Sequence, residues 1–394
     1  MAGSIDDVSC PPYDVITPER RAELMARSPY NMVRLEMPEG LGLPGSGDAG
    51  PRAARATLDA WRAAGVLRRD PEPAFYGYRT TAPPGRHPAR HTVGVVGSLT
   101  LEPPGVGILP HEETTPGSRA GHSRLLPALR VNVSPIWVLS PTAGLADLAA
   151  GAGESSPVVA HALDEDGVLH EIWRITDPDR IEAIGRLVGS APLVLADGHH
   201  RYETAMAYHE ARVAGGHVDD SGSAALMAYV VELSEEQLHV QAIHRLVLGL
   251  AEPSRLLTAL TPLFSLEPTA RPDPSISERM ASAGAPAVVT GRGTWLAHPR
   301  AEPTTPADDL DSQRVDAALS EVVAVPGVSI AYQHGWEAVS AAVAAGQADA
   351  ALLLRPPTLR QILELSRDGH RMPPKTSFFW PKPRSGLVLR ELDA

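Results

Sequence analysis

The sequence predicts a mixed fold that combines an α+β part with an α/β part, and three observations support this. Segments of strand composition dominate residues 75–176. Apolar residues with helical spacing lie on either side of them. Helix and strand patterns alternate after Pro253. We expect an N-terminal α/β segment at 1–90 that packs on the core, a central mixed domain at 91–250 and a C-terminal α/β domain at 251–394.

The N-terminal part predicts a turn, a helix and a short strand within residues 11–40. Thr17 is the expected N-cap of the helix, because its hydroxyl can accept a hydrogen bond from the first turn, and Pro18 suits the first helical position. A Gly/Pro-rich loop follows at 41–51. Residues 52–67 then predict an amphipathic helix that ends near Gly65.

The central part predicts strands, one hairpin and two helices. The hairpin falls at 155–176, where Asp166 and Gly167 supply turn residues that tolerate positive φ. The two expected helices are 177–189 and a second one that starts near His200 and runs to the glycines at 215 and 216. Expected strands are 75–80, 91–102, 106–114, 131–140, 192–196 and two around 225–250.

The C-terminal part predicts alternating helices and strands. The sequence SRLLTALTPLF and residues 314–325, 335–346 and 358–369 have helical patterns, and 286–299 predicts a hairpin. VSIAYQH and AALLLRPP have strand composition. The Asp/Pro-rich stretch 299–311 is expected to be a surface loop.

The composition argues against several classes of protein. The formal net charge is −12, whereas binding to nucleic acid needs clustered Lys and Arg to neutralise phosphates. Cys10 is the only cysteine, which excludes an intrachain disulfide and a Cys-rich zinc module and favours the cytosol. The N-terminus lacks the basic and apolar regions of a signal peptide, and no run reaches the roughly 18 apolar residues of a membrane helix. We therefore expect a cytoplasmic protein with no nucleic-acid and no membrane partner.

The stretch ADGHHR, residues 196–201, predicts an anion site between a strand and a helix. Gly198 lets a ligand approach the backbone, and the first amides of a helix, with the positive end of its dipole, attract phosphate. Arg201 offers a fork suited to phosphate, and His199 and His200 can donate to phosphate oxygens or move protons. Asp197 is a candidate Mg²⁺ ligand and proton acceptor. The simpler alternative is that Asp197 only caps the helix and that the other side chains face solvent.

The HEET segment is the second unusual stretch. His111, Glu112, Glu113 and Thr114 follow an expected strand, and Arg119 and Arg124 come shortly after them. A carboxylate in this place could deprotonate a substrate hydroxyl or bind a metal, while the arginines hold phosphate. A solvated group of charges in a loop is the competing interpretation.

Further candidates lie toward the C-terminus. His244 and Arg245 end an expected strand and are interpreted as a structural pair unless other site residues join them. Lys375, Thr376 and Lys382 lie among prolines and aromatics, in loops that either position side chains or cover a sheet edge. The chain contains no GxGxxG with a distant acid, no GxxxxGK[ST] and no HExxH, so three common types of site have no support.

Six motifs together resemble the DUF1015 family of bacterial and archaeal proteins. In chain order they are CPPYDVI, HEET, NVSPI, ADGHHRYETA, IHRL and MPPKTSFFWPKPRSGLV, from about residue 10 to residue 390. DUF1015 in turn resembles the ParB-like superfamily, which includes nucleotide-binding partition proteins and free-serine kinases that make O-phosphoserine. In those kinases the strand–turn–helix motif is close to DGHxR, which Asp197, Gly198, His199 and Arg201 match.

The resemblance implies a ParB/serine-kinase-like central domain, with nucleotide phosphates and Mg²⁺ bound at the turn. It also implies a glutamate near the substrate hydroxyl, for which Glu112 and Glu113 are the candidates. Two features depart from the family. Ser123 stands before Arg124 where family members carry an acid, which puts the activity or the substrate in question. Family members also have about 30 further residues before PPYDVI, whereas nine residues precede Cys10 here, so we expect a missing edge strand or a misassigned start.

The leading hypothesis is a nucleotide-dependent kinase that acts on serine or a serine-like hydroxy metabolite, with ATP or ADP as donor and Mg²⁺ as cofactor. The first alternative is a metal-dependent phosphohydrolase, similar to a phosphoserine phosphatase, in which His111, Glu112, Asp197 and His199 gather metal ions. The second is a non-catalytic nucleotide-binding regulator. A homodimer is compatible with each of these hypotheses.

Overall fold

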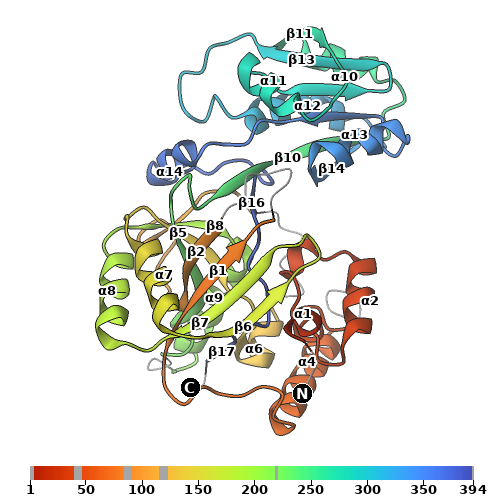
Figure 1. Ribbon diagram of the computed structural model, residues 1–394. Helices are drawn as coiled ribbons and strands as arrows, with labels where there is room; N and C mark the ends of the chain where they lie inside the picture. Colours follow the sequence, from red (N-terminus) through yellow and green to blue (C-terminus); the bar gives the residue numbers. More distant parts are fainter. Residues whose placement is uncertain (1–3, 40–46, 84–90, 115–122, 218–220, 393–394) are drawn as a thin grey trace. The chain divides into compact units, whose positions relative to one another are not determined.

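The computed structural model describes residues 4–39, 47–83, 91–114, 123–217 and 221–392 (Figure 1). The chain divides into two compact units. Unit 1 contains Met1–Pro110, Thr114–Leu238 and Pro381–Ala394, and unit 2 contains His111–Glu113 and His239–Trp380. In the sequence, unit 2 is therefore an insertion between Leu238 and Pro381 that also takes three residues of the HEET segment.

Unit 1 begins with short helices, and the predicted cap of the second is confirmed. The Thr17 side chain accepts a hydrogen bond from the backbone N–H of Arg20, and Pro18 opens the helix. The expectation of a short strand after this helix is wrong, because Asn31 accepts a hydrogen bond from Val33 N at 3.0 Å and starts a helical turn instead. These elements are α1 (Ile5–Val8), a 3₁₀ turn (Tyr13–Val15), α2 (Pro18–Arg27), α3 (Val33–Glu36) and α4 (Ala49–Ala63).

In the described part of unit 1, eight strands form one mixed sheet in the order β3-β8-β5-β9-β2-β1-β7-β6. The pairs β3·β8 and β5·β9 are parallel and the other neighbours are antiparallel. The predicted hairpin is confirmed as β6 and β7, with Gly167 at φ 76°. The strands are β1 (Phe75–Thr81), β2 (His91–Thr100), β3 (Ile108–Pro110), β5 (Ile136–Ser140), β6 (Val158–Leu163), β7 (Leu169–Ile175), β8 (Leu193–Asp197) and β9 (Ala225–Glu232).

One face of this sheet forms the main core of unit 1. Val138 and Ala228 pack there with Ala149 of α7 and Tyr202 of α9. Because side chains alternate along a strand, Trp137 and Tyr229 lie on the opposite face. Tyr229 contacts the rings of Trp137 and Tyr78 there, at centroid distances of 5.7 and 4.9 Å. The remaining elements of unit 1 are α6 (Leu125–Leu129), α7 (Leu145–Ser155), α8 (Pro178–Val188), α9 (His199–Ala214) and the paired short strands β4 (Val131–Asn132) and β17 (Arg390–Glu391).

Unit 2 combines helices with a sheet whose described strand pairs are all antiparallel, and helices pack on both faces of that sheet. Its described strands run in the order β11-β13-β12-β15-β10-β14, and β16 also pairs with β10. Neighbouring residues of β15 belong to two different hydrophobic cores. Leu352 belongs to the same core as Leu319 of α12, and Leu353 belongs to the same core as Val339 of α13. The strand β11 was not predicted from the sequence. The elements are β10 (His239–Leu248), α10 (Ser254–Leu260), β11 (Phe264–Thr269), α11 (Ile276–Ala283), β12 (Ala287–Thr290), β13 (Gly293–Pro299), α12 (Asp311–Val323), β14 (Ser329–His334), α13 (Trp336–Ala344), β15 (Ala350–Leu353), α14 (Leu359–Arg367) and β16 (Ser377–Trp380).

The fold thus mixes helices and sheets in both units, as the sequence predicts. Among the helices of the described residues, none is both long enough and apolar enough to span a bilayer.

Gly77 provides a test of packing across the sheet. It pairs with Trp173 on β7, and a Cβ on Gly77 would lie 2.1 Å from two atoms of that indole. We expect Gly77→Ala to lower the free energy of unfolding by about 1–3 kcal/mol, because the ring must leave its place. The matched control is Gly185→Ala on α8, where a Cβ meets nothing within 4 Å. It should raise stability by about 0.5–1 kcal/mol. Urea unfolding measures both changes, and equal effects would contradict this account of the packing.

Candidate functional site

The turn between β8 and α9 has the geometry expected of an anion-binding turn. Asp197 ends the strand, Gly198 adopts φ 90° and His199 begins a helix of 16 residues. A Cβ on Gly198 would lie 2.8 Å from Ile136 Cγ2 and 3.1 Å from the Arg201 guanidinium. Both the positive φ and the close packing therefore require glycine. His199 and His200 are half-buried in the first turn of the helix, where backbone N–H groups have no acceptor within the helix.

Four charged side chains meet at this turn, and we name them the turn cluster: Asp14, Asp197, Arg201 and Lys382. Arg201 Nη2 lies 2.6 Å from Asp197 Oδ2, and Lys382 Nζ lies 2.5 Å from Asp197 Oδ1. Lys382 Nζ also donates to Asp14 Oδ2 at 2.6 Å. The side chains of Arg201, Asp197 and Lys382 are 10–15% exposed. Asp14 comes from the PPYDVI motif and Lys382 from the PKPRSG motif, so both ends of the chain contribute to the turn cluster.

The two cations of the turn cluster remain charged. Burial alone would lower the pKa of Lys382, but the carboxylates of Asp14 and Asp197 outweigh it and raise that pKa above its ordinary value. Burial likewise opposes the charge of Arg201, and Asp197 and Asp14 again raise the pKa above the usual one. The Tyr13 ring lies beside the Arg201 guanidinium, 6.0 Å from its centroid, and burial raises the pKa of Tyr13 to about 12. Tyr13 is therefore a neutral wall of the site.

Three further contacts fix the chain segments that carry the turn cluster. Arg201 Nη1 donates to the carbonyl oxygen of Pro135, from the NVSPI motif. Ser385 Oγ donates to Glu36 Oε1 at 2.5 Å, and the backbones of Ser385 and Cys10 form an antiparallel bridge. Glu36 is 3% exposed, and burial raises the pKa of its carboxyl group. The segments around residues 10–14 and 382–385 are thus held together by buried polar contacts.

A buried chain of hydrogen bonds holds Arg384, two residues after Lys382. Tyr78 Oη accepts from Arg384 N at 3.0 Å and contacts His170 Nδ1 at 2.8 Å, while His170 Nε2 contacts Asp164 Oδ2 at 3.0 Å. Burial lowers the pKa of His170. Because a carboxylate can only accept, the neutral ring donates from Nε2 to Asp164 and accepts from Tyr78 at Nδ1. The chain therefore links the β6–β7 hairpin to the backbone that carries Lys382.

A separate polar cluster lies in unit 2 around the HEET segment. Glu112 accepts hydrogen bonds from the backbone N–H groups of Lys375, Thr376 and Ser377 at 2.6, 3.1 and 3.2 Å. Ser377 Oγ also donates to Glu112 at 3.2 Å and lies 2.7 Å from His111 Nε2. Lys375 adopts φ 60°, a left-handed conformation that is strained for a residue other than glycine. The Glu112 carboxylate thus fixes an irregular loop in the MPPKTSFF motif.

The IHRL motif belongs to the same unit. Arg245 is 0% exposed and makes a bidentate ion pair with Asp316 at 2.9 and 2.8 Å. It also donates to the carbonyl oxygen of Lys375 at 2.6 Å. His244 Nδ1 accepts from Leu354 N at 3.1 Å, and burial lowers its pKa to about 3. His244 is therefore neutral, with its Nδ1 lone pair engaged in a backbone hydrogen bond.

A model of the family described as "Protein of unknown function (DUF1015)" matches residues 2–317. The chain belongs to the DUF1015 family. None of the curated proteins matches this DUF1015 chain.

Solved structures resemble this DUF1015 chain only distantly. A conserved hypothetical protein from Pyrococcus furiosus is 12% identical, with 76% of this chain and 96% of that chain covered and a TM-score of 0.42. Free serine kinase in complex with AMP is 13% identical, with 76% and 92% covered and a TM-score of 0.43. SbnI from Staphylococcus aureus, with a C-terminal truncation, is 13% identical, with 75% and 85% covered and a TM-score of 0.39. These likenesses are too remote to indicate an activity.

The predicted site residues fall into two groups by unit. Unit 1 contains Asp197, Gly198, His199, His200 and Arg201 at one turn, together with Thr114 and Arg124. Thr114 Oγ1 donates to Glu203 on α9 at 3.2 Å, whereas Arg124 is 53% exposed and lies 3.8 Å from Asp48. Arg119 lies outside the described residues. Unit 2 contains His111, Glu112, Glu113, His244, Arg245, Lys375 and Thr376.

Asp14 and Tyr13 were not predicted as site residues, and Lys382 was recognised only as one of two lysines, with Lys375, among prolines and aromatics. The available signal was the recurrence of PPYDVI and PKPRSG among the family motifs. The occurrence of these motifs indicates that the two segments matter in the family. It does not show which strand or turn they contact.

The carboxylates of the turn cluster already hold cations of the protein and do not fit a magnesium ion as they stand. Among the described residues, no three His, Cys, Asp or Glu side chains gather in a metal-binding arrangement. Asp14 and Asp197 both contact the ammonium group of Lys382. Asp197 also pairs with Arg201, so Mg²⁺ on these carboxylates would have to displace a cation of the protein.

Tyr78→Phe tests the buried hydrogen-bond chain. It leaves Arg384 N and His170 Nδ1 without their shared partner, so we expect unfolding free energy to fall by about 1–3 kcal/mol. Tyr76→Phe is the matched control, because Tyr76 Oη contacts the exposed Asp70 carboxylate and its loss should cost less than about 1 kcal/mol. Urea unfolding of both variants decides the matter. A loss for Tyr78→Phe no larger than for the control would refute the linking role.

His244 makes stability depend on pH. In the folded protein its pKa is about 3 instead of 6.5, so only the unfolded chain takes up this proton as pH falls below 6.5. Proton uptake by the unfolded chain has almost no effect at pH 7 and above. At pH 5 it lowers the free energy of unfolding by about 2 kcal/mol. In His244→Gln the amide oxygen can still accept from Leu354 N. Between pH 7 and pH 5, the free energy of unfolding of this variant should fall by about 2 kcal/mol less than that of the parent protein. If the free energy of unfolding depends on pH equally in the variant and the parent protein, His244 takes up its proton in the folded state as well.

Proposed function

We propose that the β8–α9 turn binds nucleotide phosphates and that the protein transfers a phosphoryl group from ATP or ADP to a small hydroxy metabolite. The observation that carries the proposal is the turn cluster, in which Arg201 and Lys382 are fixed at the first turn of α9. Serine is the candidate acceptor, because the DGHHR motif resembles the DGHxR motif of free-serine kinases.

The electrostatics of the turn support phosphate binding. The two carboxylates and two cations of the turn cluster sum to no net charge, so the positive end of the α9 dipole is not cancelled there. His199 and His200 add hydrogen-bond donors in the same turn. Phosphoryl transfer depends mainly on such positioning and neutralisation.

Of the two glutamates considered as general bases, Glu112 is already engaged within unit 2. Both oxygens of Glu112 accept hydrogen bonds from residues 375–377, so this carboxylate already serves a loop. Glu113 is exposed. Its backbone N–H donates to Met372 O at 2.9 Å, which anchors the segment that contains it.

The direct test supplies the purified protein with serine, Mg²⁺ and either ATP or ADP. We expect O-phosphoserine, detected by ³¹P NMR and mass spectrometry. Absence of O-phosphoserine with both donors would remove serine as the acceptor. Release of phosphate from O-phosphoserine without nucleotide would support a phosphohydrolase instead, and nucleotide binding without turnover would support a regulator.

A variant of the helix start tests the binding part alone. His200→Ala should weaken nucleotide binding about ten- to hundredfold, the value of one hydrogen bond to a charged group, as measured by calorimetry. The matched control is His217→Ala, because His217 is exposed beyond the C-terminal end of the same helix, roughly 24 Å from its start. If the two variants bind nucleotide equally well, the phosphates do not lie at this turn.

A further inference from the structure

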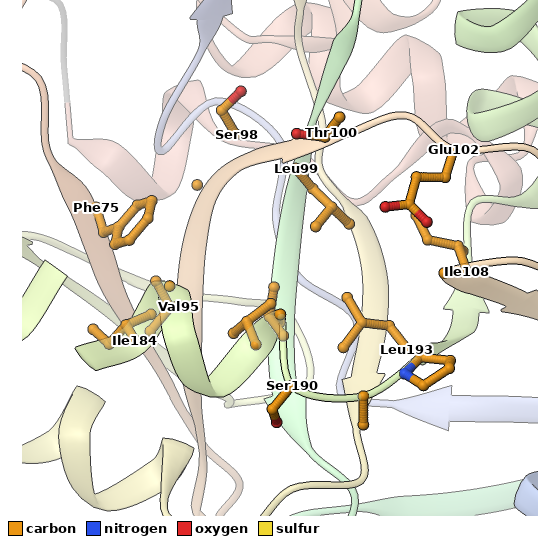
Figure 2. A pocket seen from close by; sticks show the side chains of 18 residues that line it. Phe75, Val95, Ser98, Leu99, Thr100, Glu102, Ile108, Ile184, Ser190 and Leu193 are labelled. Atoms are coloured by element: carbon orange, nitrogen blue, oxygen red, sulfur yellow. The ribbon is translucent and has the colours of Figure 1, made fainter. Parts of the chain in front are cut away.

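A cavity lies in unit 1 at the start of β8 (Figure 2). It is a cavity of about 480 Å³, within the usual range for small-molecule sites. The sheet supplies its floor through Val95, Leu99 and Val230, and α8 supplies a wall through Ile184 and Val188. In Figure 2 the Leu99 side chain points into the cavity. The cavity is therefore an apolar space between a sheet and a helix.

Glu102 is the one charged side chain among the residues that line this cavity. Its carboxylate points toward the space in Figure 2 and is half-buried. Its backbone is held, because Tyr202 Oη donates to the Glu102 carbonyl oxygen. Within the described part of the chain, no side chain or backbone N–H donates to its carboxylate. A partly desolvated carboxylate of this kind favours a cationic partner.

The end of α8 adds to this preference. The helix ends at Val188, and Val188, Gly189 and Ser190 all line the cavity. The carbonyl end of a helix carries partial negative charge and favours cations. Two independent features, a carboxylate and a helix C-terminus, therefore give the cavity a preference for positive charge. The β8–α9 turn has the opposite preference.

Glycines keep the cavity open. A Cβ on Gly107 would lie 1.9 Å from the Glu102 carboxylate, and a Cβ on Gly97 would lie 2.6 Å from the Phe75 ring. The absence of side chains at both positions lets Glu102 and Phe75 lie flat along the wall. Gly185 also lines the cavity, and a Cβ there meets nothing within 4 Å.

We propose that this cavity is a binding site for a small organic amine, with an apolar or aromatic body against the sheet and an ammonium group on Glu102. The ammonium group pairs with the carboxylate and the carbonyl end of α8, while the body covers Leu99, Ile108 and Val188. An anionic ligand of the same shape is excluded by Glu102. The site does not depend on the phosphate chemistry proposed for the turn.

Three indole compounds of similar size test the proposal without nucleotide present. Tryptamine carries an ammonium group, tryptophol a hydroxyl and indole-3-acetate a carboxylate. Saturation-transfer NMR titrations should show that tryptamine binds about tenfold more tightly than tryptophol and that indole-3-acetate does not bind. Equal binding of tryptamine and tryptophol, or no binding of tryptamine, would overturn the proposal.

Variants locate the binding. Glu102→Gln should weaken tryptamine binding about tenfold and leave tryptophol binding unchanged, because only the charge is removed. Glu182→Gln is the matched control on the exposed part of α8, where Glu182 contacts Arg186, and it should change neither affinity. Gly185→Leu places a side chain at the cavity and should weaken both ligands. Full tryptamine affinity in Glu102→Gln would place the amine elsewhere.

Discussion

The ammonium group of Lys382, held between Asp14 and Asp197, is the interaction on which unit 1 depends. An ion that is 10% exposed loses most of its hydration, so its partners must be close and correctly oriented. Those partners come from positions 368 and 185 residues away in the sequence. Both chain ends must therefore meet at the β8–α9 turn before the site exists, which makes the site a product of the completed fold.

The contacts around this ion pair keep its geometry fixed. Arg384, Ser385 and Glu36 are each buried and hydrogen-bonded, and they lie within a few residues of the turn cluster or against it. A phosphate site needs donors that are already in place, because reorganisation would consume binding free energy. Buried polar contacts usually stabilise little on net, so their concentration here is better explained by the positioning of Lys382 and Arg201 than by stability.

Local structure was predictable where a few neighbouring residues determine it. The Thr17 cap, the Asp166–Gly167 hairpin and the glycine turn after β8 each depend on side chains within four positions. Long-range partners were not predictable: nothing in PPYDVI or PKPRSG shows that Asp14 and Lys382 form an ion pair. Nor does the continuous motif MPPKTSFFWPKPRSGLV show that it divides after Trp380 between two units. The short helix at 33–36 was missed because the Asn31 side chain accepts from Val33 N, and this local turn outweighs the strand-like alternation that follows.

The order α8, β8, α9 agrees with the opposite charge preferences of the two proposed sites in unit 1. A strand of five residues separates the C-terminal end of one helix from the N-terminal end of the next. Helix dipoles therefore favour cations near Leu193 and anions near Gly198, roughly 15 Å apart along the chain. The side chains follow the same rule, because the Glu102 carboxylate lies at the first end and Arg201 and Lys382 lie at the second. At each end of β8, the helix dipole and the side chains thus favour a ligand charge of the same sign. Such agreement is expected where both ends bind charged ligands.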